Sequence, residues 1–140
     1  MESNYKNTNA QNRFLYFGAA ATTILAGIIH LYLAANSISH HRFGNNVILF
    51  LVGGLAQVFW VLPILKKWGK VWYSIGIAGT IAFVAIWVIT RMPGNPITHR
   101  GSEVDPIDIV TEAFQLAFIG LSFAILAIEN RRVKKQLGND

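Results

Sequence analysis

The sequence predicts an all-α membrane protein, a bundle of four transmembrane helices that run up, down, up and down with both termini in the cytoplasm. Two observations lead to this prediction. Of the 140 residues, 53% are hydrophobic and only 14% are charged, whereas a soluble domain carries about 25% charged residues. The hydrophobic residues also gather in four stretches, each close to the roughly 20 residues that a helix needs to cross about 30 Å of hydrocarbon.

Each stretch is bounded by charged residues or by proline and glycine. The predicted organisation is a polar cytoplasmic tail at residues 1–13, a membrane domain at residues 14–128 with spans at about 14–36, 47–65, 71–90 and 107–128, and a basic cytoplasmic tail at residues 129–140. A cleavable signal peptide is the competing interpretation of the first span. That span is longer than the roughly 7–15 apolar residues of a signal-peptide core, so we expect it to be retained as a helix.

The segments between the spans contain signals that begin or end helices. The fourth helix is expected to begin at or near Pro106, a proline suited to the first helical position. Asp105 before it is an N-cap candidate, and Asp108 is an acid in the first turn. Two prolines and Gly94 between Met92 and Pro96 cannot continue the third helix. Pro63 falls in the last turn of the second span, where it favours a kink or an early end.

Lysine and arginine are unevenly distributed among the loops. Nine of the 12 lie in the two tails and in the loop between the second and third spans, against Arg42, Arg91 and Arg100 on the other side. The positive-inside rule therefore predicts that both termini of this multi-pass cell-membrane protein are cytoplasmic. Insertion and anionic lipid headgroups account for the net charge of +5, and a nucleic-acid partner is not indicated.

Several polar side chains fall within or at the ends of the predicted spans, where an ionised group costs about 2.5 to 3.5 kcal/mol at the bilayer centre. The candidate intramembrane cluster consists of His30, Gln57, Trp87, Arg91, Asp108, Glu112 and Gln115. At ~1.5 Å rise per residue, His30 is ~9 Å and Glu112 ~7.5 Å below the outer boundary. These two side chains are therefore expected to lie in one layer of the bundle.

Helical spacing extends this layer into a polar chamber. Asp108, Glu112 and Gln115 share one helical face, while Arg91 lies one turn beyond Trp87 and can reach Asp108 or Glu112. Gln57 would form the floor, and the loop over residues 91–106 would cap the chamber. Each member also has a structural interpretation: Arg91 as a boundary residue that snorkels, Asp108 as a helix cap, Gln57 as a hydrogen bond between helices, and the charged residues as a structural ion pair.

Other chemistry is weakly indicated or excluded. The loops offer a candidate surface metal site, whose residues would be His40, His41, His99 and Glu103. The alternative interpretation is that these are solvated loop residues, since short motif matches of this kind are common. The absence of cysteine excludes Cys-ligated zinc and iron–sulfur sites. A haem with two axial histidine ligands is not favoured within one chain, because only one histidine lies in a predicted span. No recognised catalytic motif is present, so enzymatic activity is not indicated and no cofactor is identified.

Several short motifs occur in a defined order along the chain: HL at His30, GGLAQ ending at Gln57, W-x-x-x-R-x-P from Trp87, and E-x-x-Q from Glu112. This order resembles a pattern in small four-span membrane proteins of archaea and actinobacteria whose activity is unassigned. The resemblance implies a four-helix membrane bundle in which His30, Gln57, Trp87, Arg91 and Glu112 act as a set. The chain is also similar in size and character to small accessory subunits of archaeal membrane oxidoreductases, such as the copper-dependent ammonia monooxygenase.

Two functions follow as hypotheses. The first, which needs fewer assumptions, is a non-catalytic structural or accessory subunit that packs against partner membrane proteins or against copies of itself, with a small-residue outer surface along Gly18, Thr22 and Gly27. The second is a small-ligand, metal or proton-handling site inside the bundle. Its residues would be His30, Trp87, Arg91 and Glu112.

Overall fold

A computed structural model describes residues 2–40, 44–97 and 103–137, with side chains from residue 13 to residue 131 within these ranges. The described chain consists of four helices, α1 (Glu2–Ser39), α2 (Asn45–Leu65), α3 (Lys70–Arg91) and α4 (Pro106–Leu137). Each contains a segment long and apolar enough to cross a membrane, namely Arg13–Ser39, Asn45–Leu65, Lys70–Arg91 and Pro106–Arg131. The prediction of an all-helical protein with four such helices is confirmed.

The helix ends follow the local sequence signals. The helix α4 begins at Pro106, and the side chain of Asp108 accepts a hydrogen bond from the backbone N–H of Asp105 at 3.2 Å. The helix α3 ends at Arg91, just before a turn in which Gly94 takes a positive φ of 67°. Pro63 lies inside the last turn of α2, which nevertheless continues to Leu65.

Two helices continue beyond the predicted spans. The helix α1 begins at Glu2, well before the predicted start at residue 14, and α4 runs on to Leu137. Polar and charged residues such as those of the two tails are compatible with a helix outside the membrane, where water replaces lipid around them. The apolar length of a stretch therefore measures the membrane segment and not the whole helix.

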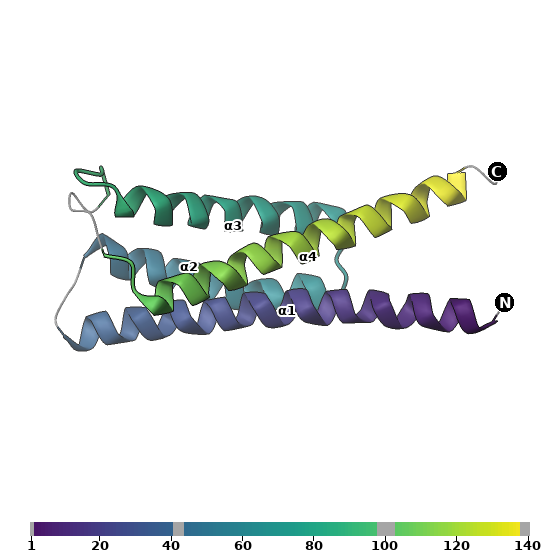
Figure 1. Cartoon of the computed structure of the whole chain (residues 1–140), viewed down its shortest axis with the longest axis horizontal. Helices are drawn as coiled ribbons and strands as arrows, with labels where there is room; N and C mark the ends of the chain where they lie inside the picture. The colour runs from purple at the N-terminus through teal and green to yellow at the C-terminus, as the bar shows by residue number, and fades with distance from the viewer. Residues whose placement is uncertain (1, 41–43, 98–102, 138–140) are drawn as a thin grey trace.

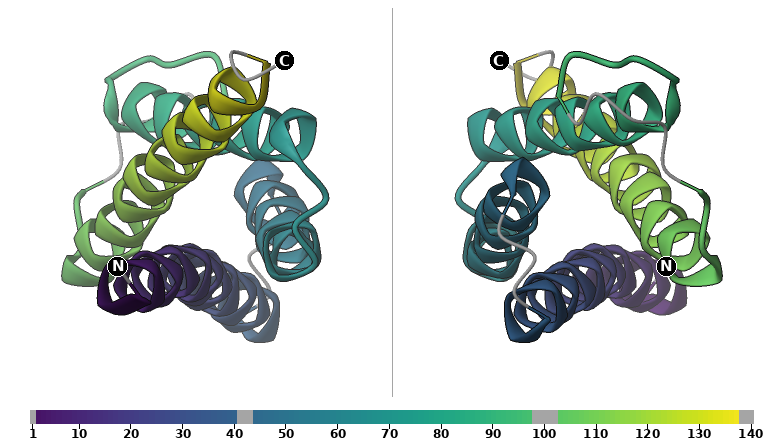
Figure 2. Two further views of the ribbon diagram at one scale, coloured as in Figure 1. Left: turned by 90° about the vertical axis from the view of Figure 1, so that its right-hand side faces the viewer. Right: turned by 90° about the vertical axis from the view of Figure 1, so that its left-hand side faces the viewer.

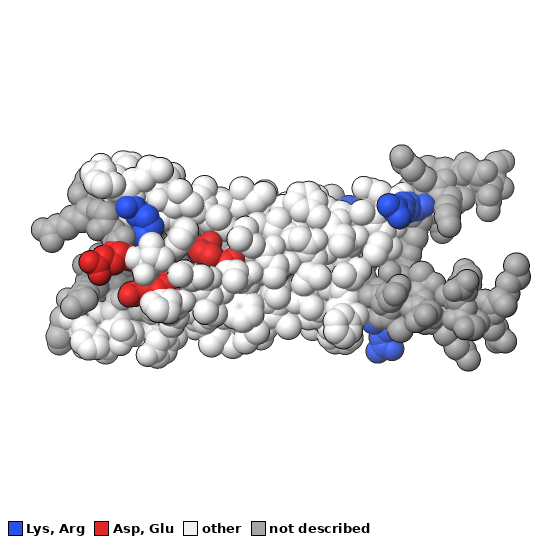
Figure 3. All heavy atoms as spheres, viewed as in Figure 1, with Lys and Arg blue, Asp and Glu red and all other residues white. Residues whose placement is uncertain are grey.

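The four helices form a ring. Each helix packs on its neighbours along the chain, and α4 returns to α1 (Figure 2). Within the described residues, the backbones of the opposite pairs α1 and α3, or α2 and α4, do not approach closely, but side chains of α1 and α3 meet in the middle, as the rings of Tyr16 and Tyr73 do with centres 6.1 Å apart. Both termini lie at one end, here called the terminal end, and the connections after α1 and α3 lie at the other, the loop end (Figure 1). On the face shown in Figure 3, charged side chains lie toward these two ends with a broad uncharged band between them.

Helices α1 and α2 pack most extensively, because two glycines let their backbones approach each other. A Cβ atom added to Gly54 would lie 2.9 Å from the carbonyl oxygen of Gly27, and one added to Gly27 would lie 3.0 Å from that of Gly54. Gly18 in turn packs against Leu121 of α4. The expectation that Gly18, Thr22 and Gly27 form an outer surface is wrong for the two glycines, because Gly18 packs against α4 and Gly27 packs against α2.

Candidate functional site

His30 of α1 is buried, with 8% of its surface exposed, and its ring is held by two hydrogen bonds. Its Nδ1 atom lies 3.0 Å from the carbonyl oxygen of Ala26 and 3.0 Å from Oε1 of Gln57. A backbone carbonyl only accepts hydrogen bonds, so Nδ1 must carry a proton and donate it. In the neutral ring, Nε2 is then a free lone pair that can accept a hydrogen bond.

Gln57 of α2 joins α1 to α2 in the middle of the bundle. Its side chain accepts from His30, and its backbone carbonyl accepts a hydrogen bond of 3.1 Å from the hydroxyl of Thr23. Both contacts connect α2 to α1, which agrees with the interpretation of Gln57 as a hydrogen-bonded link between helices. The same contacts also set the orientation of the His30 ring.

Arg91 and Asp108 form an ion pair between α3 and α4. The guanidinium Nη2 lies 2.5 Å from Oδ2 of Asp108, and the guanidinium carbon lies 5.1 Å from the ring centre of Trp87 one turn below. Because Asp108 also accepts from the backbone of Asp105, it serves both as helix cap and as partner of Arg91. The charge of Arg91 is therefore balanced within the bundle.

Glu112 is buried without an equivalent partner. Only 8% of its surface is exposed, and its Oε2 atom has no hydrogen-bond partner among the described residues. Neither Arg91 nor His30 forms an ion pair with it, since Arg91 pairs with Asp108 one turn nearer the loop end. Gln115, which is 1% exposed, likewise has both side-chain polar atoms without partners within the described chain. Buried polar atoms of this kind are uncommon in native structures and call for an explanation.

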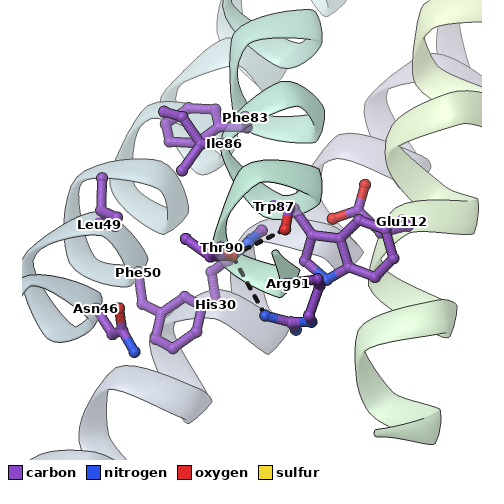
Figure 4. Close-up of a pocket in the computed structure, with 10 residues that line it drawn as sticks. All are labelled: His30, Asn46, Leu49, Phe50, Phe83, Ile86, Trp87, Thr90, Arg91 and Glu112. Carbon is purple, nitrogen blue, oxygen red and sulfur yellow. Dashed lines mark hydrogen bonds between the residues drawn. The ribbon is translucent and has the colours of Figure 1, made fainter. Parts of the chain in front are cut away.

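A cavity near the loop end, the outer cavity, collects part of this cluster (Figure 4). It offers about 60 Å³ to the centre of a water molecule, and a single water needs about 10 to 15 Å³ by that measure. Its wall comes from all four helices and consists of His30, Asn46, Leu49, Phe50, Phe83, Ile86, Trp87, Thr90, Arg91 and Glu112. Of the predicted cluster, Gln57, Asp108 and Gln115 do not line this cavity. Gln57 bonds to His30 of the wall, and Asp108 pairs with Arg91 of the wall.

Two aromatic residues of the wall, Phe50 and Phe83, are not among the site residues that the sequence predicts, whereas Trp87 is. The ring centre of His30 lies 5.7 Å from that of Phe50 and 6.4 Å from that of Phe83. A signal for Phe83 exists, because it lies one turn before Trp87 and two turns before Arg91 on the same face of α3. Phe50 similarly lies on the face of α2 that carries Gln57, two turns away.

The proposed surface metal site is not assembled in the described part of the chain. His40 and Glu103 are exposed, and Nδ1 of His40 lies 2.8 Å from the carbonyl oxygen of Asn36. His41 and His99 lie outside the described residues. Within the described ranges, no three His, Cys, Asp or Glu side chains come together as metal ligands.

Comparison with protein-family models, curated proteins and solved structures found no match for this chain.

Proposed function

We propose that this protein is a multi-pass membrane protein with helices of alternating direction and both termini in the cytoplasm, and that its outer cavity binds a small polar molecule in the outer half of the bilayer. The observation that supports this most directly is the unpartnered Oε2 atom of Glu112 in the wall of the outer cavity. A carboxyl oxygen shielded from solvent and left without a partner costs more than a satisfied one. A bound molecule that donates to it would remove that cost.

Two other residues of the wall also have a buried polar atom without a hydrogen-bond partner among the described residues. Nε1 of Trp87 and Nε of Arg91 are buried donors without acceptors among the described residues. Each buried unpaired polar group costs about 1 to 3 kcal/mol, so together with Glu112 they favour an occupant that hydrogen-bonds on several sides. The lone pair on Nε2 of His30 adds one more acceptor. The expected ligand therefore has both donor and acceptor groups.

The alternative is the structural or accessory subunit, in a complex with partner membrane proteins, including a copper-dependent monooxygenase, or with copies of this chain. Its support is the apolar outer surface, which carries exposed residues such as Leu55, Val71 and Phe123. Lipid and partner helices require the same kind of surface. The apolar exterior therefore does not favour this alternative over the ligand site, whereas the unpartnered atoms of the outer cavity do favour the ligand site.

Native mass spectrometry of the protein purified in a mild detergent, combined with metal analysis, separates the two functions. We expect a protein of the chain's own mass or a small multiple of it, with a bound small molecule that is lost in the Glu112→Gln variant. The control is Glu103→Gln, because Glu103 is an exposed carboxylate that does not line the outer cavity. An empty bundle that purifies with a stoichiometric partner protein would contradict the proposal and support the accessory role.

A further inference from the structure

A second cavity lies beside the outer cavity, toward the terminal end, and is here called the inner cavity. It offers about 100 Å³ to the centre of a water molecule, and its wall consists of Thr23, Ala56, Gln57, Trp60, Ile75, Gly76, Gly79, Thr80 and Phe83. Phe83 belongs to both walls, and Gln57 of the inner wall bonds to His30 of the outer wall. Most wall residues of both cavities come from α2 and α3, the neighbouring pair that packs least in this ring.

The two cavities differ in what they offer a ligand. The hydroxyl of Thr80 already donates to the carbonyl of Gly76 at 2.9 Å, and Nε1 of Trp60 donates to the carbonyl of Trp72 at 3.2 Å. Thr23 is likewise satisfied by the backbone of Gln57. The inner cavity therefore presents mainly carbon surface, whereas the outer cavity has the unpartnered atoms of Trp87, Arg91 and Glu112.

The inner cavity also has a side that faces outward from the bundle. Ile75 is 49% exposed, and Gly79 is exposed with no atom within 4 Å of the position its Cβ would take. In a membrane, this side of α3 would face the acyl chains at the level of the bilayer interior. An apolar chain could enter there without crossing water.

We infer that the two cavities form one site for an amphiphile, with a flat hydrogen-bonding ring in the outer cavity and a hydrocarbon tail in the inner cavity, which is the chemistry of a lipid quinol. This inference rests on the proposed function of the outer cavity and names the class of its ligand. The rings of Phe50, Phe83 and Trp87 in the wall favour a flat aromatic head.

Charge favours an uncharged head over a phospholipid headgroup. Arg91 is already paired with Asp108, and Glu112 of the same wall adds a carboxyl group with no cation of its own among the described residues. A phosphate would therefore meet acidic side chains without a free cation to balance it. The hydroxyl groups of a quinol, which both donate and accept hydrogen bonds, instead match Glu112, Trp87 and Arg91 without adding charge.

The direction of the site also fits a membrane amphiphile. The outer cavity lies toward the loop end, and the inner cavity lies toward the middle of the bundle, between Thr23 on α1 and Thr80 on α3. In the proposed orientation, the head would lie in the outer half of the bilayer with its tail pointing to the centre. Lipids of the outer leaflet have the same direction.

Binding of two probes to the full-length protein in detergent tests the inference. The probes are a 1,4-benzoquinol with a decyl tail and the same ring without the tail, with dissociation constants measured under anaerobic conditions by the change in tryptophan fluorescence at a fixed detergent concentration. In the unmodified protein we expect the tail to strengthen binding by about tenfold, because apolar surface is buried in the inner cavity. Gly79→Leu should fill the mouth of that cavity, remove most of the advantage of the tail and leave binding of the ring alone unchanged.

The matched control is Gly120→Leu. Gly120 is also an exposed helical glycine with no atom within 4 Å of its Cβ position, but it lines neither cavity. Equal affinity for both probes, equal behaviour of the Gly79 and Gly120 variants, or displacement of the decyl probe by a short-chain phospholipid at the same concentration would each overturn the inference. Loss of the bound native molecule in Glu112→Gln would still support the proposed function, so the two failures are distinguishable.

Discussion

At the scale of single residues, His30 shows how one hydrogen bond determines the chemistry of a side chain. The carbonyl of Ala26 requires a proton on Nδ1, and Gln57 accepts from the same atom. The ring is thereby fixed in orientation and in tautomer, with Nε2 as the acceptor. An imidazole held in this way needs no reorganisation when a hydrogen-bond donor approaches Nε2.

The His30–Gln57 contact predicts an asymmetry between two substitutions. Gln57→Leu leaves His30 its bond to Ala26, so we expect a loss of about 1 kcal/mol in the free energy of unfolding. His30→Leu leaves the buried Oε1 of Gln57 without its partner, and the expected loss is about 1 to 3 kcal/mol. Unfolding in detergent by titration with a denaturing surfactant measures both. A larger loss for Gln57→Leu would contradict the assigned tautomer and its hydrogen bonds.

The ion pair between Arg91 and Asp108 makes a second prediction. Asp108→Asn removes the charge that balances Arg91 but keeps an oxygen that can accept from Asp105, so we expect loss of the ion pair to lower the free energy of unfolding by about 2 kcal/mol. The control Glu103→Gln changes an exposed acid in the loop that precedes α4 and should have almost no effect. Thermal unfolding of both variants in one detergent compares them. Equal melting temperatures would show that Arg91 does not depend on Asp108.

At the scale of helices, α1 and α2 form the tightest pair because Gly27 and Gly54 face each other. Their backbones approach so closely that an added Cβ on either glycine meets the carbonyl of the other. Small residues at such contacts are a common basis of helix association in membranes. The helices α1 and α2 therefore pack closely, whereas α2 and α3 pack least and most of the wall of both cavities comes from them.

Glycine-to-alanine substitutions test this contact. Gly27→Ala should push α1 and α2 apart and lower the free energy of unfolding by about 1 to 3 kcal/mol, as overpacking does. Gly120→Ala meets no atom within 4 Å, and it should be neutral or stabilise the protein by up to about 1 kcal/mol through helix propensity. The measurement is again unfolding in detergent. A stable Gly27→Ala variant would show that the two helices do not require this close approach.

Much of the element scale follows from the sequence, and the exceptions have physical reasons. Apolar length predicts four helices, and Pro106 and Gly94 predict where α4 begins and where α3 cannot continue. The extension of α1 to Glu2 is not predicted, because apolar length carries no information about a helix outside lipid. The outward position of Gly18 and Gly27 is predicted wrongly, because small residues pack equally well inside a bundle and between proteins.

At the scale of the whole molecule, the ring of helices decides which residues meet. Spacing along one helix places Arg91 above Trp87 and places Asp108, Glu112 and Gln115 on one face, and these relations follow from the sequence. The choice of Asp108 over Glu112 as the partner of Arg91 depends on the relative height of α3 and α4, which no pattern within one helix contains. The aromatic wall and the inner cavity depend in the same way on how far α2 and α3 stand apart.

The proposed orientation gives a prediction for the whole molecule, and the absence of cysteine in the chain makes it simple to test. A single cysteine at Glu103, near the loop end, should react with a membrane-impermeant maleimide in intact cells. A single cysteine at Lys66, in the turn after α2, should react only after the cells are permeabilised. The opposite pattern would place both termini outside and the cavity in the inner half of the bilayer.

The exposed mouth of the inner cavity at Ile75 and Gly79 opens the site to the hydrocarbon, the phase in which the proposed tailed ligand dissolves. Because nearly all of such a ligand is in the lipid, its mole fraction there sets the occupancy at equilibrium. Diluting a suspension of vesicles with buffer would leave the bound fraction unchanged. Fusing the same vesicles with ligand-free lipid would lower it, although the amount of ligand per litre stays constant.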